Sequence, residues 1–183
     1  MAAILEVGQV DYEFVEVDIP DFLGGPGKKK AIWGAMPEMQ LPDGTKMAEV
    51  CAICSTLSRY YPILAGVTPA DEGISNMIGL KINEIYTTIS ADPRGPRIAM
   101  NMTKAMWEDK KALPDLMKVH DEAMEQMKPL IAKLNELCSS TGKFTSTGTT
   151  WGELFAWGFL YQWRHAKLAM CTPMPANLAK FMD

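Results

Sequence analysis

Two cysteines with the spacing of a redox pair, Cys51 and Cys54, are the first residues that could carry chemistry. A CxxC pair cycles between dithiol and disulfide when the pKa of one thiol is low. Cys54, however, falls on the apolar face of the helix predicted from Val50 onward. The pattern therefore favours packing over redox catalysis for both thiols.

Histidines and cysteines do not recur with the spacing of a metal site. There is no second CxxC, and His120 and His165 are isolated in the sequence, whereas a zinc site needs several such ligands together. For His165, a surface or capping role is favoured over a place in a pocket. The sequence also lacks a Ser-His-Asp arrangement, a phosphate-binding loop and a dinucleotide fingerprint. We therefore expect no metal.

The composition limits the class of protein. The chain has 183 residues, of which 48% are apolar and 22% charged, as in a globular protein. Its net charge of −4 argues against a nucleic-acid partner and a basic membrane-binding surface. Four cysteines are too few for a disulfide scaffold. The start lacks the basic segment of a signal peptide, and the longest apolar stretch, Leu154–Trp163, is shorter than the ~20 residues that span a bilayer. We expect a cytoplasmic protein.

The first third of the chain predicts a small α/β unit. Tyr12–Val17 alternates apolar and acidic side chains, which predicts a half-buried strand. Glu38–Leu41 predicts a second strand, Pro42–Thr45 a tight turn, and Lys46–Ala48 the other arm of a hairpin. The glycine-rich stretch Gly24–Gly27 and the following Lys28–Lys30 predict a loop through which no strand or helix runs.

The rest of the chain has helical periodicity. A stripe from Val50 to Leu57 predicts the first helix, and Thr68–Asp71 has the hydroxyl, proline and acid of a helix start. Further helices are predicted over residues 98–138 and 149–170. The predicted apolar face of the helix that starts at Thr68 consists of Ile74, Met77, Ile78, Ile82, Ile85 and Ile89. We expect an α/β domain over residues 1–62 and an all-helical domain over residues 68–183.

Three motifs together resemble the cytosolic glutathione S-transferases, a family that joins a thioredoxin-like domain to an all-helical domain. The first is GQVDYEF at residues 8–14, which resembles the passage from the first helix into the second strand. The second is MPEM at residues 36–39, followed by DG at 43–44 and MAEVCAI at 47–53. The third is TWGEL at residues 150–154, which resembles the capping box of the core helix. The resemblance implies this fold for most of the chain.

The resemblance also implies a glutathione site on the first domain. Met36 and Pro37 match the pair whose cis bond presents the backbone of the first residue to the cysteinyl part of glutathione. Lys28 matches the lysine that binds the glycyl carboxylate, and Phe22 stands where several classes carry a tryptophan. Glu49 matches the acid or amide that precedes the helix receiving the γ-glutamyl group.

Two departures from the family's pattern bear on binding and catalysis. Val50 falls on the family's serine, beside Cys51 of the same motif, and its missing hydroxyl should weaken γ-glutamyl binding by roughly 1–3 kcal/mol. The family's catalytic Tyr, Ser or Cys lies at or just after the end of the first strand, ahead of the first helix, but residues 2–7 already read as that helix. Tyr12 belongs to the predicted second strand, where it is assigned a packing role. No catalytic residue is assigned.

The missing first strand also affects the sheet. In the family this strand lies between the second and third, so the strand predicted at Tyr12–Val17 would lose its hydrogen-bonding neighbour. We expect displacement of this segment, or a strand lent by another chain. A longer chain that supplied the strand would bring back the catalytic position.

Two functions of different classes remain open. The first is an enzyme of detoxification, a divergent glutathione S-transferase that conjugates glutathione to small electrophiles. The second is a non-catalytic, transferase-like binding or structural dimer, as the family's lens crystallins are. Both imply a homodimer. The sequence predicts that glutathione binds weakly as cosubstrate and that conjugation is weak or lost.

Overall fold

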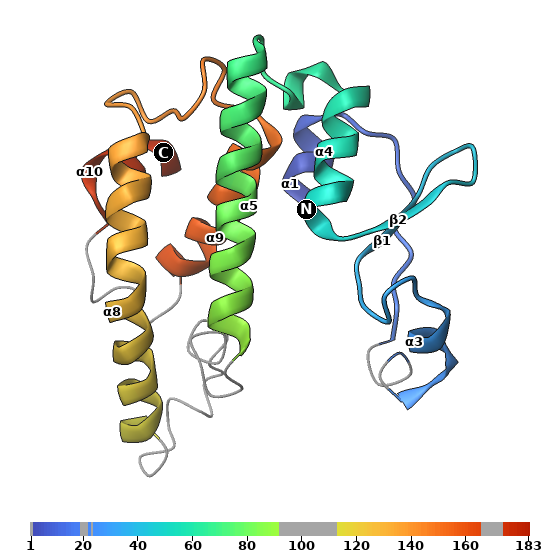
Figure 1. The fold of residues 1–183 in the computed structure, drawn as a ribbon, viewed down its shortest axis with the longest axis horizontal. Coiled ribbons are helices and arrows are strands. Elements are labelled where there is room, and N and C mark those ends of the chain that lie inside the picture. Colours follow the sequence, from blue (N-terminus) through green and yellow to red (C-terminus); the bar gives the residue numbers. More distant parts are fainter. Residues whose placement is uncertain (1, 19–21, 23, 92–112, 166–173) are drawn as a thin grey trace.

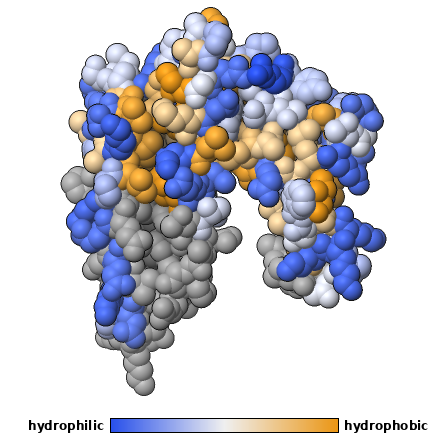
Figure 2. Space-filling model, in the orientation of Figure 1, coloured by the Kyte–Doolittle hydropathy of each residue, from blue (hydrophilic) through white to orange (hydrophobic). Residues whose placement is uncertain are grey.

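The computed structural model describes residues 2–18, 22, 24–91, 113–165 and 174–183. Figure 1 shows an arm that carries a small hairpin, and beside it a bundle of longer helices. The two parts meet at one end of the molecule and diverge toward the other (Figure 1). This arrangement leaves the molecule hollowed between the arm and the bundle, as Figure 2 shows.

The arm and its junction with the bundle consist of short elements. They are α1 (Ala2–Val7), α3 (Pro26–Lys30), β1 (Glu38–Gln40), β2 (Lys46–Ala48), α4 (Val50–Tyr60) and the 3-10 turn η1 (Pro62–Leu64). Their buried core is formed by Ile4, Ile53, Cys54, Leu57, Leu64 and Trp151. Since Trp151 comes from a later helix, this core is closed by a residue from the far half of the chain.

The bundle consists of long helices. They are α5 (Pro69–Ala91), α8 (Leu113–Leu137), α9 (Trp151–His165) and the short α10 (Ala176–Met182). Their core is formed by Ile78, Ile82, Ile85, Ile131, Leu134, Cys138, Phe144, Ala156, Phe159, Leu160, Leu178 and Met182. The described residues therefore gather around two apolar cores, while the domain boundary between residues 62 and 68 stays a prediction.

The hairpin predicted from the sequence is confirmed. β1 and β2 pair antiparallel, with Met39 opposite Met47. The turn closes with the amide of Thr45 donating to the Asp43 carboxylate at 2.8 Å, and Gly44 adopts a φ of +88°. A residue with a Cβ would be strained at that φ, which explains the glycine.

The strand predicted at Tyr12–Val17 is wrong. This segment has no regular secondary structure, and no backbone hydrogen bond joins residues 11–17 to another described residue. Its apolar side chains are not half-buried: the exposed fraction of Phe14 is 78% and that of Val15 is 70%. Among the described residues, this segment therefore has the unpaired backbone groups expected for a strand that lacks its neighbour.

The helices from residue 50 onward follow the predicted pattern, with one exception. Ile53, Cys54 and Leu57 of α4 are buried, as are Ile78, Ile82 and Ile85 of α5. Met77 was predicted on the buried face of α5, but 47% of it is exposed because it lies on the edge of the stripe that turns away from α9. The side chain of Ile89, and the predicted helical stretches 98–112 and 166–170, lie outside the described residues.

Two buried carboxylates hold the loop between α8 and α9. Asp71 accepts hydrogen bonds from the amide and hydroxyl of Ser146 at 2.9 and 2.8 Å, and from the amides of Val67 and Thr68 at 3.1 Å each. These bonds stabilise the charged form, so they hold the pKa of the Asp71 carboxyl well below its usual range. The loop is thereby fixed to the start of α5.

Glu153 is the second of these carboxylates. It is 1% exposed, and it accepts from the amides of Phe144 and Thr145 at 2.8 and 2.9 Å and from the amide and hydroxyl of Thr150 at 3.2 and 2.9 Å. Thr150 and Glu153 are the pair of the predicted capping box. A buried carboxylate needs such partners, because an unpaired one would be costly.

α5 and α9 approach closely at two glycines, one on each helix. A Cβ on Gly152 of α9 would lie 1.9 Å from the carbonyl oxygen of Ser75, and a Cβ on Gly79 of α5 would lie 2.2 Å from the ring of Trp151. Both distances are far below van der Waals contact. The two helices can pack at this distance only because neither position has a side chain.

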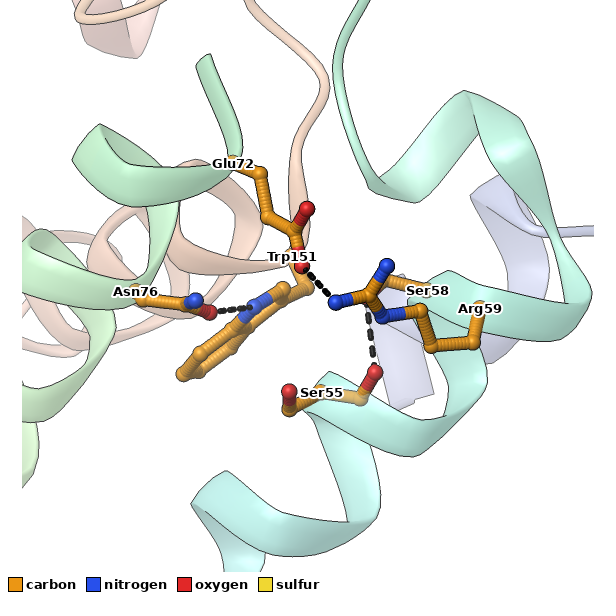
Figure 3. A network of polar contacts seen from close by, with 6 residues as sticks. All are labelled: Ser55, Ser58, Arg59, Glu72, Asn76 and Trp151. Carbon is orange, nitrogen blue, oxygen red and sulfur yellow. Dashed lines mark hydrogen bonds and ion pairs between the residues drawn. The ribbon is translucent and has the colours of Figure 1, made fainter. Parts of the chain in front are cut away.

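A polar network joins α4 of the arm to α5 and α9. Arg59 forms an ion pair with Glu72 at 2.6 Å, and the indole N–H of Trp151 donates to the Asn76 amide oxygen at 3.0 Å. Figure 3 shows these contacts crossing from one helix to the next. The Trp151 contact is the better shielded, since the Arg59 side chain is 70% exposed and water weakens its ion pair.

Replacing Gly152 with alanine should destabilise the protein by at least about 2 kcal/mol, because the methyl group would force α5 and α9 apart. Gly158 lies on the same helix with nothing within 4 Å of an added Cβ, so Gly158→Ala should instead stabilise by up to about 1 kcal/mol. Urea unfolding of both variants measures the difference. Equal effects of the two substitutions would contradict the close packing.

Replacing Asp71 with asparagine should lower the free energy of unfolding at neutral pH by about 1–3 kcal/mol, because an amide cannot accept all of these bonds. Since the pKa of Asp71 is lowered by folding, its contribution is complete above the unfolded pKa of about 4 and disappears as the pH falls further. The difference between wild type and Asp71→Asn should therefore shrink below that pH. Denaturant unfolding at pH 7 and pH 3 checks this, with exposed Asp115→Asn as the control.

Candidate functional site

The residues proposed from the sequence as a binding site all belong to the arm. Met36 and Pro37 precede β1, and the segment from Glu49 opens α4. Phe22 precedes α3, whereas Lys28 lies within it, so the loop predicted from Gly24 to Lys30 is wrong from Pro26 onward. Figure 1 shows β1 and β2 between the α3 end and the α4 end of the arm. The candidate site is therefore assembled around the hairpin.

The Met36–Pro37 peptide bond is cis, as the resemblance implied. Met36 is 47% exposed, and no backbone hydrogen bond to it occurs among the described residues. Its N–H and C=O therefore have no partner among the described residues, and they can pair with an extended ligand in the manner of an added strand. Gly34, with a φ of +63°, turns the chain two residues earlier.

Lys28 lies against the loop that leads to Met36. A side chain on Gly34 would meet the Lys28 carbonyl oxygen at 3.5 Å and its Cγ at 3.7 Å, so the two segments are in contact. The ammonium end of Lys28 remains exposed. On the other side of α3, the ring of Phe22 is half-buried and would lie 3.4 Å from a Cβ on Gly27. Phe22 thus supports α3 by packing.

Glu38 is a positioning residue that the sequence reasoning missed. Its carboxylate accepts a hydrogen bond from the amide of Ile32, which ties the loop after α3 to the first residue of β1. Lys28 precedes this link in the sequence, and Met36 lies within the loop that it closes. A motif search does not single out Glu38, because the signal is its distance from Ile32 and not its type.

Glu49 adopts an unusual backbone conformation at the start of α4. Its φ is 71° and its ψ is 117°, a region that residues with a side chain rarely occupy. It is exposed, caps no backbone amide with its side chain, and its carbonyl accepts from Ile53 at 2.9 Å. Strained residues of this kind cluster at binding sites. The half-buried Val50 follows as the first residue of α4.

The surroundings of the two CxxC thiols disfavour a reactive cysteine. Burial raises the pKa of the half-buried Cys51, and the nearby Glu49 raises it further. Burial raises the pKa of Cys54 to about 12. The Cys51 thiol lies 3.9 Å from the carbonyl oxygen of Gly79 on α5. A redox or nucleophilic cysteine needs a lowered pKa, so neither thiol has the electrostatics of a reactive one.

Tyr12 does not have the packing role assigned to it. It is 43% exposed, and its hydroxyl donates to the Glu6 carboxylate at 3.3 Å. A tyrosine that stabilises a thiolate must direct its hydroxyl toward the sulfur, whereas this hydroxyl is directed to an acid on α1. Met36, Pro37 and Lys28 lie in one region of the arm. The Tyr12 hydroxyl is bonded to Glu6 and is not directed toward a thiol.

The residues that the structure describes contain neither a candidate metal site nor a helix that could span a membrane. Within the described ranges, no group of three or more His, Cys, Asp or Glu side chains could hold a metal ion. The side chains of His120 and His165 lie outside those residues. In the part of the chain that the structure describes, no helix is both long and apolar enough to cross a membrane.

Comparison with known proteins identifies the fold. No protein-family model matches the sequence, and no curated protein matches it significantly. Among solved structures, the glutathione S-transferase from Ascaris lumbricoides is 20% identical, with a TM-score of 0.66 over 99% of this chain and 88% of that one. NaGST-2 is also 20% identical, with a TM-score of 0.69 over 98% and 82%. The Fasciola hepatica sigma class enzyme is 20% identical, with a TM-score of 0.70 over 99% and 80%.

The chain therefore has the glutathione S-transferase fold. The expected combination of a thioredoxin-like first part and a helical second part is confirmed. At 20% identity the likeness concerns the fold and not the site. The roles given to Phe22, Lys28, Met36, Pro37, Glu49, Val50 and Cys51 stay predictions.

Proposed function

We propose that this protein is a glutathione S-transferase-like protein that binds glutathione weakly on its arm and has little or no conjugating activity. The observation that carries the proposal is the unpartnered backbone of Met36 before β1, in a chain with the transferase fold. This backbone is the element that pairs with the cysteinyl part of an extended tripeptide.

Charge at the two ends of the site supports a doubly anionic ligand. Lys28 is exposed beside the loop that leads to Met36 and can bind a carboxylate at one end of the ligand. At the other end, the free amides at the start of α4 favour a second carboxylate. Val50 opposes binding there, since it offers no hydroxyl and its branched side chain crowds the first turn.

The weak or absent catalysis follows from the groups around the proposed ligand. Conjugation needs a donor or positive potential that stabilises the thiolate of glutathione. Among the candidates considered, Tyr12 directs its hydroxyl to Glu6, and the pKa of Cys51 is raised. These observations favour the second candidate function, a non-catalytic binding or structural protein. Detoxification belongs to the first candidate only, whereas a cytoplasmic location is proposed for either.

Replacing Val50 with serine should tighten glutathione binding by about 1 kcal/mol or more, because the new hydroxyl can bond to the γ-glutamyl carboxylate. We expect a wild-type Kd of roughly 1 mM, equivalent to about −4 kcal/mol. Turnover with an aryl halide should stay near background in both proteins, since Val50 does not act on the sulfur. Calorimetric titration and a conjugation assay measure the two quantities separately.

Two matched variants isolate the cause. Val50→Thr adds the hydroxyl but keeps the branched shape, whereas Val50→Ala removes the crowding without adding a donor. If glutathione binds more tightly to the serine and threonine variants but not to the alanine variant, the hydroxyl is the cause. If all three variants bind glutathione equally more tightly, the cause is relief of the crowding by the valine side chain. Absence of any glutathione binding in wild type and Val50→Ser would refute the proposed site.

A homodimer is the second part of the proposal. α5 exposes apolar side chains on the face away from α9: Met77 is 47% exposed and Leu80 is 57% exposed. An apolar strip on a long helix is typical of a surface that a second subunit covers. The small Gly73, one turn before Met77, would allow another helix to approach closely.

Replacing Leu80 with glutamate should shift the protein from dimer to monomer, because a charge would be buried in that interface. Sedimentation equilibrium measures the change, and circular dichroism shows whether the fold is kept. Lys81→Glu is the control, since Lys81 neighbours Leu80 but pairs with Glu84 on the exposed side. A wild-type monomer at high concentration, or an unchanged dimer in Leu80→Glu, would contradict this assignment.

A further inference from the structure

Two unpaired surfaces of opposite charge lie on the arm. The first, the acidic segment, is residues 11–17 with the sequence DYEFVEV; the second, the basic segment, is residues 28–33 with the sequence KKKAIW. Figure 1 shows the chain after α1 descending past the hairpin toward α3. Figure 2 shows hydrophilic residues gathered at the α3 end of the arm.

The acidic segment combines charge with exposed apolar surface. Asp11, Glu13 and Glu16 are exposed, and none forms an ion pair with another described residue. Between them, Phe14 is 78% exposed and Val15 is 70% exposed. The backbone from residue 11 to 17 has no hydrogen-bond partner in the described part of the chain. A segment with unpaired backbone groups and exposed apolar side chains is open to association.

The basic segment has the complementary composition. Lys28, Lys29 and Lys30 are exposed and form no ion pair with any residue that the structure describes. Directly after them, Ile32 is 41% exposed and Trp33 is 70% exposed. Each segment therefore offers the charge and the apolar surface that the other lacks, yet within one molecule they do not pair.

We propose that the arms of two molecules associate, with the acidic segment of each against the basic segment of the other. Such a contact is isologous. If the acidic segment of one copy meets the basic segment of its partner, the two-fold axis brings the basic segment of the first copy against the acidic segment of the partner. Phe14 and Val15 then lose exposure against Ile32 and Trp33, while the acids and lysines pair. The contact is separate from the α5 strip and does not depend on glutathione binding.

The test uses two charge-swapped proteins. Variant one carries Glu13→Lys and Glu16→Lys, so both of its segments are basic; variant two carries Lys29→Glu and Lys30→Glu, so both of its segments are acidic. Each alone should lose arm association, because both symmetric contacts become repulsive. Mixed together, the two should associate again, since each segment of one then meets a segment of opposite charge on the other. Lys28 is left unchanged because it belongs to the proposed glutathione site.

Fluorescence-detected sedimentation of labelled protein in like and mixed pairs measures the association. The mixed pair should bind at least about tenfold more tightly than either like pair, and the difference should disappear near 0.5 M salt because screening removes the charge attraction. Any α5 contact is identical in all pairs, so it cancels from the comparison. Phe14→Ser should weaken wild-type arm association at low and high salt alike.

A matched control removes the effect of net charge. Glu125→Lys with Glu136→Lys changes α8 by the same charge as variant one, far from the arm in the sequence and at two exposed ion pairs. Mixed with variant two, it leaves one of the two contacts repulsive, so it should restore association less than variant one does. The proposal is overturned if the like pairs associate as the wild type does, if the mixed pair is no tighter than they are, or if the α8 control restores binding equally well.

Discussion

The position of the Trp151 indole determines how the two halves of the chain fit together. It is 1% exposed at the first residue of α9, yet it completes the core formed by α1, α4 and η1. Its N–H is held by Asn76, and Gly79 leaves room for its ring on α5. Burying an indole stabilises strongly through its large apolar area. Since this one ring packs in the core of the arm and also contacts α5, the arm cannot move relative to the bundle without breaking these contacts.

This constraint explains how a fold with so little sheet remains ordered. β1 and β2 have three residues each, too little for an independent sheet. The arm is instead held by α1 and α4, whose Ile4 and Ile53 are buried against Trp151. Packing between helices thus replaces the hydrogen bonds that a central strand would provide. The cost falls on Tyr12–Val17, which is left without a sheet to join.

The sequence predicted well what depends on neighbouring residues and poorly what depends on distant ones. The turn at Gly44, the start of α5 at Thr68 and the cap of Thr150 by Glu153 are local, and all are confirmed. Tyr12–Val17 has the alternation of a strand, but a strand also needs a partner that alternation cannot reveal. The closeness of Gly152 to Ser75 and the link from Glu38 to Ile32 are tertiary, so no local pattern marks them. For the site, only the cis Met36–Pro37 bond was testable.

Ligands or partners can contribute most to stability at the part of the arm around α3 and the loop before β1. Lys28, Met36 and Trp33 are exposed there, and the described contacts that hold this region include the single side-chain link from Glu38 to Ile32. A molecule that binds the folded arm and not the unfolded chain adds its binding free energy to the stability of that arm. Bundle residues such as Glu153 already have their hydrogen bonds within the protein and gain little from a partner. Binding energy and folding energy thus reside in different parts of this chain, so the groups on the arm can change while the fold is kept.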